Sequence, residues 1–165
     1  MKNKNSIILT NRCELSKLTR DDIDEAMGLF TNEQVRLYLG GILSEEQSLD
    51  KLHGWVNNKN DLYLSVRLLD TDDFIGILSI SIHHDNESKE LSYQFLPDYW
   101  GNGFAYETVK ALLEYLGTLN HYNFLIAETQ TNNEKSCKLL SKLGFELVRV
   151  VFRFGEKQSI YRVIL

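Results

Sequence analysis

Several features that often set a protein's class are scarce in this chain of 165 residues. It has one proline, two cysteines and no low-complexity tract, which excludes a proline-rich linker, a disulfide scaffold and a repeat array. Cys13 and Cys137 lie far apart and lack metal-ligand spacing, which predicts free thiols in a reducing compartment. No apolar run approaches the length of a membrane span, and residues 1–10 lack the apolar core of a signal peptide. We therefore expect a cytoplasmic protein with no membrane partner.

Basic residues are also in deficit. The formal net charge is −5 and the sequence pI is about 5.4, and no basic face is evident, which argues against nucleic acid as the main partner. An acidic chain is compatible with a cationic substrate such as an amine. The four histidines show no metal-binding pattern, and His83-His84 is expected to lie in an exposed turn. We expect no metal site.

Hydrophobic residues make up 43% of the chain and charged residues 25%, which is typical of a globular protein. The length predicts one domain that spans residues 1–165. Its first part contains a strand over 12–18, followed by a helix capped by Thr19. Thr31 is expected to cap a second short helix, and Ser44 with Gln47 forms a capping box for a third.

The remaining elements predict a mixed sheet. Three β-prone runs with short connections, over 62–69, 74–82 and 89–96, predict an antiparallel meander. A helix over 104–119 then leads to a short buried strand over 124–127, which a crossover of this kind makes parallel to the strand before the helix. Another helix, capped by Asn132 or Asn133 and ended by Gly144, precedes a hairpin formed by residues 146–154 and 159–165. The expected fold class is α/β, with about seven strands flanked by helices on both faces.

The stretch between the third meander strand and the long helix predicts a phosphate site. Gly101 and Gly103 form a tight turn between residues 89–96 and 104–119. A strand, a glycine turn and a helix N-terminus present free backbone N–H groups and a favourable dipole to an anion. Such a turn is also common in proteins where it binds no ligand. Whether it binds phosphate here must therefore be judged from the rest of the chain.

In this order of elements the chain resembles the GCN5-related N-acetyltransferase (GNAT) superfamily, and more narrowly its ribosomal-protein-alanine N-acetyltransferase (RimJ/RimL-type) branch. The resemblance covers residues 11–147. It is carried by the opening segment 14–22, the segment 32–41 ending in Tyr38-Leu39-Gly40-Gly41, Phe74-Ile75-Gly76-Ile77, the arm 96–105, and Asn133-Glu134-Lys135-Ser136 followed by Leu143-Gly144-Phe145. It implies the GNAT acyl-CoA N-acyltransferase fold and acetyl-CoA as co-substrate.

The resemblance also implies a set of cofactor contacts. The arm would hold the pyrophosphate, and the backbone of Phe95 and Leu96 would bond the pantetheine in a gap between two splayed strands, where an N–H would polarise the thioester carbonyl. Asn133 and Ser136 would contact the pantetheine on its thiol side. The residues implied to bind acetyl-CoA are Phe95, Leu96, Trp100, Gly101, Asn102, Gly103, Phe104, Ala105, Asn133 and Ser136.

Two positions depart from the family pattern. Trp100 stands where many members have Arg or Gln at the start of the arm, which removes a polar contact but leaves the N–H groups. Leu140 stands where many members have the tyrosine that protonates the leaving thiolate. Ser136 then becomes the substitute acid, with a plain helix-terminal serine as the alternative.

Glu90 is the first candidate for the base that deprotonates the acceptor amine, because the branch often has a glutamate in a similar Glu-Leu-x-Tyr stretch. The alternative is a solvent-facing strand residue paired with a lysine. Tyr93 and Trp55 are candidates for lining the acceptor side, against an alternative of ordinary packing.

The expected function is transfer of an acetyl group from acetyl-CoA to a primary amine by direct attack. A protein N-terminal amine is favoured over a small amine such as an aminoglycoside or a polyamine, and the protein is expected to be a monomer or a homodimer. A non-catalytic acyl-CoA-binding module is the alternative from another class. A nucleotide-binding βαβ domain is a third hypothesis, but the predicted meander argues against it.

Overall fold

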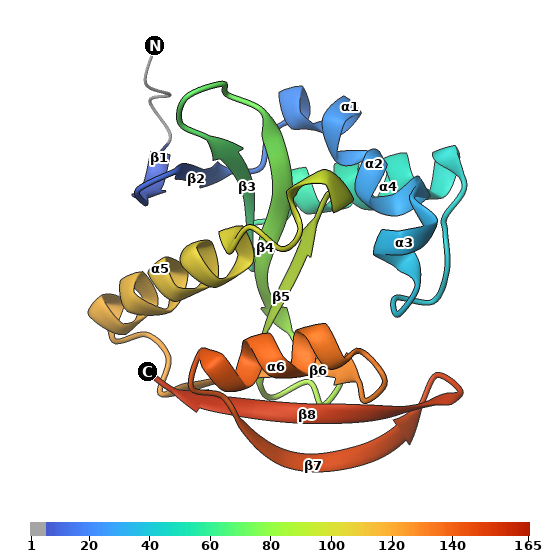
Figure 1. Ribbon diagram of the computed structural model, residues 1–165, viewed down its shortest axis with the longest axis vertical. Coiled ribbons are helices and arrows are strands. Elements are labelled where there is room, and N and C mark those ends of the chain that lie inside the picture. The colour runs from blue at the N-terminus through green and yellow to red at the C-terminus, as the bar shows by residue number, and fades with distance from the viewer. Residues whose placement is uncertain (1–5) are drawn as a thin grey trace.

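The computed structural model describes residues 6–165 and shows one eight-stranded mixed sheet with helices on both faces (Figure 1). The strand order across the sheet is β1-β2-β3-β4-β5-β6-β8-β7. The strands are β1 (Ser6–Leu9), β2 (Cys13–Lys17), β3 (Leu62–Leu68), β4 (Phe74–Ile82), β5 (Lys89–Phe95), β6 (Phe124–Gln130), β7 (Glu146–Arg153) and β8 (Glu156–Ile164). The helices are η1 (Arg20–Asp22), α1 (Ile23–Ala26), α2 (Gly28–Thr31), α3 (Glu33–Arg36), α4 (Glu45–Asn57), η2 (Pro97–Tyr99), α5 (Phe104–Leu119) and α6 (Glu134–Lys142).

The pairing of the strands confirms the expected α/β class. Strands β3, β4 and β5 form an antiparallel meander, and β6 returns parallel to β5 after the crossover helix α5. Strands β7 and β8 form the expected hairpin, whose turn residues Phe154 and Gly155 both have positive φ, as the tightest hairpin turns require. Strand β1 is an eighth strand beyond the seven expected. It lies within the opening segment 1–10, of which residues 1–5 are outside the described part of the chain.

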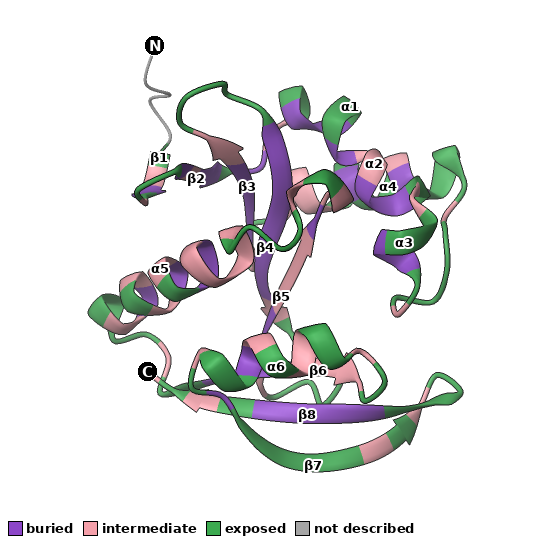
Figure 2. Cartoon of the chain, in the orientation of Figure 1, coloured by how far each residue is buried: buried purple, intermediate pink, exposed green. Residues whose placement is uncertain are grey.

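Two hydrophobic cores lie on opposite faces of the sheet. Helices α5 and α6 cover one face, where the core includes Leu64, Leu78, Leu91 and Leu112. Helices α1 to α4 cover the other face around Phe30 and neighbouring apolar residues. Figure 2 shows β4 buried along most of its length between these layers, because each face of this central strand meets a helical layer.

Local capping accounts for where several helices begin and end. The Ser44–Gln47 capping box is confirmed, with Gln47 N–H donating to Ser44 Oγ at 3.2 Å and Ser44 N–H to Gln47 Oε1 at 3.0 Å. The prediction that Thr31 caps the next helix is wrong. Asn32 caps α3 instead, since its Oδ1 accepts from the backbone N–H groups of Gln34 and Val35, whereas Thr31 ends α2. An amide oxygen one residue later satisfies the free N–H groups that a cap must bind.

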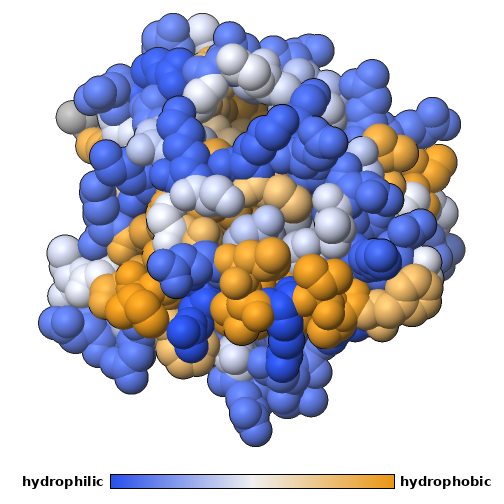
Figure 3. Space-filling model, turned by 60° about the horizontal axis from the view of Figure 1, so that its bottom comes forward, coloured by the Kyte–Doolittle hydropathy of each residue, from blue (hydrophilic) through white to orange (hydrophobic). Residues whose placement is uncertain are grey.

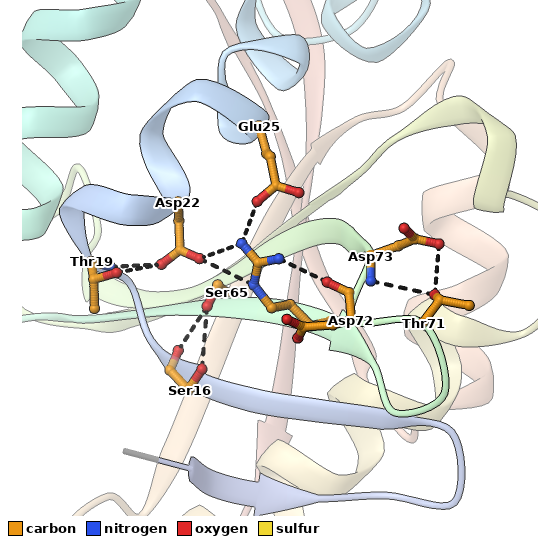
Figure 4. Close-up of polar contacts among 9 residues, drawn as sticks. Ser16, Thr19, Asp22, Glu25, Ser65, Thr71, Asp72 and Asp73 are labelled. Carbon is orange, nitrogen blue, oxygen red and sulfur yellow. Dashed lines mark hydrogen bonds and ion pairs between the residues drawn. The ribbon is translucent and has the colours of Figure 1, made fainter. Parts of the chain in front are cut away.

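A partly buried arginine on β3, Arg67, ties the first helices to the sheet, and Figure 4 shows its partners Asp22, Glu25 and Asp72. Arg67 Nη2 lies 2.9 Å from Asp22 Oδ1 and also pairs with Glu25, while Nη1 donates to the Asp72 carbonyl at 2.8 Å. Asp22 Oδ2 in turn accepts from both the backbone N–H and the hydroxyl of Thr19. This saturated cluster anchors η1 and α1 over the sheet.

Strand β7 forms one edge of the described sheet and carries exposed apolar side chains, among them Phe152 at 75% and Leu147 at 54% exposure. Figure 3 turns this edge toward the viewer and shows apolar groups in a row broken by polar ones. Arg149 and Arg153 alternate with them along the strand, as charges on edge strands commonly do. Within residues 6–165, no helix combines the length and apolarity that crossing a bilayer requires.

Candidate active site

The sheet forks between β5 and β6. In the described chain these strands pair at a single position, Glu90 opposite Ile126, although β5 pairs with β4 along its whole length. Beyond Glu90 the second edge of β5 therefore faces an opening. Such an edge presents backbone N–H and C=O groups that an extended ligand can bond in the manner of an added strand.

Backbone orientation decides which of these groups are free. Leu96 N–H donates to Ile75 O on β4 at 2.9 Å, and its carbonyl accepts from Tyr99 N–H at 3.1 Å. Because successive residues of a strand point to opposite edges, Phe95 presents its N–H and C=O to the opening. Trp100 Nε1 donates to that carbonyl at 2.7 Å. Of Phe95 and Leu96, only Phe95 therefore presents a backbone N–H to the fork. The N–H and the carbonyl of Leu96 are both hydrogen-bonded within the protein.

The glycine arm lies directly after this strand. Gly101 and Gly103 have φ of +75° and +81°, a region that L side chains rarely adopt, and Gly103 is the N-cap of α5. Among residues 6–165, no side chain caps this helix start. The first N–H groups of α5, from Phe104 and Ala105 onward, are therefore left for an anion.

Arg12, in the turn between β1 and β2, holds the arm from outside. Its Nη1 donates to the Asn102 carbonyl at 3.0 Å, its guanidinium lies 4.2 Å from the centre of the Phe104 ring, and its Nη2 is 2.6 Å from Glu107 Oε2. Burial acts to raise the pKa of Glu107, but hydrogen bonds from Thr10 and Arg12 outweigh it and lower that pKa. An arginine from outside the arm, itself paired with Glu107, thus adds to the hydrogen bonds that the arm makes within itself.

Two lysines of α6 face aromatic rings at the arm and at the start of α5. Lys135 Nζ is 5.6 Å from the centre of the Trp100 ring, and Lys142 Nζ is 4.5 Å from that of Tyr106. Each ring holds a cation by its face. The result is positive charge on the side of α5 that meets α6, where a phosphorylated ligand held by the arm would benefit from it.

Residues of β5 and α6 form a hydroxyl pair across the opening. Tyr93 Oη and Ser136 Oγ are 2.7 Å apart. Burial raises the pKa of Tyr93 to about 12, so its phenol stays protonated at neutral pH. Asn133 Oδ1 accepts from the Ser136 N–H at 3.2 Å and so serves as the N-cap of α6, as the sequence predicts. Leu140 is 1% exposed and packs into the core.

Glu90 occupies the base of the fork. It is partly buried, and Lys89 beside it pairs with Asp61 at 2.8 Å, so the alternative of a lysine-paired surface residue is not what the structure shows. Burial raises the pKa of Glu90 to about 7, and the nearby Glu128 carboxylate adds to this rise. His83, a hydrogen bond from the Glu128 backbone and Arg153 oppose it. A carboxyl group that titrates near neutral pH suits a general base.

Tyr93 and Trp55 do not lie together. Tyr93 belongs to the side of the sheet covered by α5 and α6, and Trp55 packs in the other core. The Trp55 ring stacks on Tyr63 with centroids 4.8 Å apart and meets Phe30 edge-on at 5.4 Å. This placement favours the packing alternative for Trp55.

Sequence reasoning missed four charged or titratable residues around the site: Arg12, His83, Glu128 and Arg153. The expectation that His83 lies exposed is wrong, because its side chain is 1% exposed and its Nε2 is 2.6 Å from Glu128 Oε2. No local motif marks these residues, since their partners are 45 to 95 residues away in several cases. Among residues 6–165, no group of three ligating side chains is arranged to hold a metal ion.

A groove of about 520 Å³ lies between the β1–β2 turn and α5, lined in part by Arg12, Gly103 and Glu107. Figure 1 places β1 and α6 on opposite sides of α5, so this groove is separated from the fork by the helix. Its link to the site is the Arg12 clamp.

The family follows from comparison with known proteins. The model of the acetyltransferase (GNAT) domain matches residues 12–146. The uncharacterized N-acetyltransferase YoaA of Bacillus subtilis (strain 168) is 27% identical over 146 residues, covering 85% of this chain and 82% of that protein. The chain belongs to the GNAT acetyltransferase family, which confirms the expected superfamily and makes it an acetyl-CoA-dependent N-acetyltransferase.

Solved structures share the fold, and two of them are described by different acceptors. An acetyltransferase from Salmonella typhimurium that modifies the N-terminal serine of ribosomal protein L7/L12 has a TM-score of 0.80 at 14% identity, covering 94% of this chain and 96% of its own. Spermidine N-acetyltransferase from Vibrio cholerae, in complex with CoA and spermine, has a TM-score of 0.79 at 19% identity, covering 92% and 95%. The likeness confirms the fold, while the acceptors of the two neighbours differ.

Proposed function

We propose that this chain, as a single acetyltransferase domain of the RimJ/RimL-type branch, transfers the acetyl group of acetyl-CoA to the α-amino group at the N-terminus of a protein. The observation that carries the proposal is Glu90 at the fork, a base whose pKa is about 7. An α-amino group has a pKa near 8 and a lysine or polyamine amine one near 10.4. A base of this strength deprotonates the first far more readily than the second.

The residues present fit acetyl-CoA. The uncapped start of α5 after Gly103 supplies N–H groups for the pyrophosphate, and the free edge of β5 supplies the Phe95 N–H. Bound there, acetyl-CoA contributes a thioester as the acetyl donor. Phe95 N–H is proposed to stabilise the negative charge that develops on the thioester oxygen. Leu96 is proposed to act by positioning Phe95, since its own backbone groups are engaged.

Two further roles belong to the proposal. Glu90 takes the proton of the acceptor ammonium, which frees the amine lone pair for attack. The Tyr93–Ser136 hydroxyl pair supplies a proton to the departing thiolate, in place of the tyrosine that Leu140 replaces. Trp55 is proposed to support the acceptor side by packing in the core beneath helices α1 to α4.

The test is CoA release with acetyl-CoA and a panel of acceptors on the full chain. Peptides with a free N-terminus are compared with the same peptides blocked at the N-terminus, and with polyamines and aminoglycosides. We expect turnover with free N-termini and none with blocked ones. Preference for a polyamine or an aminoglycoside would overturn the acceptor class. Tight CoA binding without turnover on any amine would identify a non-catalytic acyl-CoA-binding module.

A further inference from the structure

Glu128 on β6 has a buried carboxylate in which one oxygen contacts two donors and the other contacts none among the described residues. Its side chain is 7% exposed. Oε2 lies 2.6 Å from His83 Nε2 and 3.1 Å from Arg153 Nη2. Oε1 is buried without a hydrogen-bond partner among the described residues. A buried carboxylate oxygen without a donor is costly, so its retention calls for a group that can supply one.

Both partners of Oε2 are held in place from elsewhere in the fold. His83 Nδ1 lies 3.2 Å from the Asp85 N–H nitrogen and 3.3 Å from the Asp85 carboxylate. Because Nδ1 accepts from the Asp85 N–H, the ring proton is assigned to Nε2, which donates to Glu128. The Arg153 carbonyl accepts from Gln158 Nε2 at 3.1 Å, which fixes the end of β7.

Strand register brings Glu128 to Glu90. Glu90 is opposite Ile126 at the single pairing of β5 with β6, and Glu128 is two residues further along β6. Since side chains alternate along a strand, Glu90 and Glu128 project from the same face at the point where the strands part. The charged groups that act on Glu90 come from three different segments: His83 after β4, Glu128 on β6 and Arg153 on β7.

We propose that Glu128, held by His83 and Arg153, is a positioning residue for Glu90, and that the two carboxyl groups share the proton taken from the acceptor amine. This inference rests on the proposed function. An N–H bond of the acceptor ammonium breaks, an O–H bond forms on Glu90, and that O–H donates to the free Oε1 of Glu128. The amine keeps the electron pair with which it attacks the thioester carbon. Because Oε2 of Glu128 already accepts from His83 and Arg153, the proposed resting place of the shared proton is Glu90.

The competing explanation is a purely structural clamp. His83, Glu128 and Arg153 also join the two halves of the sheet at its fork, and a clamp alone would explain their contacts. A clamp predicts that removal of any member loosens the fold. A clamp does not predict opposite shifts of the Glu90 titration midpoint when the negative Glu128 is removed and when the positive Arg153 is removed.

The decisive measurement is carboxyl carbon NMR of the full chain labelled at glutamate, titrated without acetyl-CoA or acceptor. Glu90→Gln assigns the Glu90 signal. In the parent protein we expect its midpoint near 7. Glu128→Gln removes a neighbouring negative charge and should lower the midpoint by about 1 pH unit, whereas Arg153→Met should raise it by about half a unit. Arg153→Lys should restore it in part. Shifts in the same direction, or no shift in either folded variant, overturn the proposal.

A second variant covers the case in which Glu128→Gln does not fold. Neither variant keeps the influence by which His83 opposes the rise of the Glu90 pKa, so both should raise the midpoint. His83→Gln keeps an N–H donor near Oε2, whereas His83→Ala also frees Oε2 and should raise the midpoint further. Equal midpoints for these two variants also overturn the proposal. The pH profile of kcat/KM for the acceptor should move with the NMR midpoints. If no amine is turned over, the proposed function fails, but the NMR result still decides the shared proton.

Discussion

Two arginines pair with acidic side chains from distant parts of this chain. Arg67 on β3 pairs with Asp22 and Glu25 of the first helices, and Arg153 on β7 pairs with Glu128 at the fork. Around Arg67, both oxygens of Asp22 have donors. Around Arg153, Glu128 has one oxygen bound twice and one bound to nothing in the described residues. The two clusters have similar composition, but only the second leaves an acceptor unused.

The difference distinguishes a structural ion cluster from one placed for chemistry. In a cluster whose buried acceptor atoms all have donors, no acceptor is left for another proton, and the complete cluster contributes to stability. An unsaturated buried carboxylate next to Glu90 can take a hydrogen bond that appears only when Glu90 is protonated. We therefore expect substitutions at the Arg67 cluster to reduce stability more than activity, and substitutions at the fork to reduce activity more than stability.

The largest expected effect is on stability at the saturated cluster. Arg67→Met keeps the apolar stem but leaves buried Asp22 without its cation, and should lower the free energy of unfolding by about 3 kcal/mol. The acetylation rate should stay within about twofold, because Arg67 is remote from the fork. Urea unfolding and CoA release on the same preparation measure both. A large loss of kcat in a folded variant would contradict the separation of the two clusters.

Glu90→Gln should reduce activity rather than stability. The rate constant kcat should fall at least about tenfold, since a general base commonly contributes more than that, with acetyl-CoA binding unchanged. Near-normal kcat across pH would remove Glu90 from the mechanism.

The same substitution should stabilise the protein at high pH. Because folding raises the pKa of Glu90 from 4.5 to about 7, ionisation of Glu90 destabilises the folded state. This penalty is absent below pH 4.5 and complete above pH 7. The advantage of Glu90→Gln should therefore grow across that window to about 1–3 kcal/mol. Exposed Glu114→Gln is the control, with no expected change beyond about 0.5 kcal/mol.

A smaller effect is expected at the arm, which lies outside both clusters. Gly103 has φ of +81°, so Gly103→Ala should strain the start of α5 by about 1 kcal/mol and weaken CoA binding about fivefold. Gly117→Ala is the matched control in the same helix, where an added Cβ meets no atom of residues 6–165 within 4 Å. It should leave CoA binding unchanged and slightly stabilise the helix. Calorimetric titration with CoA compares the two, and equal affinities would argue against the arm as the phosphate site.

The smallest expected effect concerns the hydroxyl pair. A thiolate is a good leaving group that needs only a mild acid, so Tyr93→Phe should lower kcat about threefold. Ser136→Ala should do the same, and the double variant should be no slower than either single one if the pair acts as a unit. Additive losses would mean that the two hydroxyls act independently.

Local chemistry made part of the site predictable from sequence. The positive φ at Gly101 and Gly103, the cap at Asn133 and the helix end at Gly144 each depend on a few neighbouring residues. Their residue types indicate the backbone they permit. The short edge strand β1 escaped prediction because four residues with little alternation carry too weak a pattern.

By itself, the sequence determined the family, the glycine arm and the candidate base at Glu90. Only the tertiary structure decided what surrounds that base, because strand register and the fork bring His83, Glu128 and Arg153 together from separate segments. The same holds for Arg12 on the arm and for Tyr93 at Ser136. A contact between residues far apart in the chain has no local signature, since it depends on how the strands pair rather than on the residues beside it.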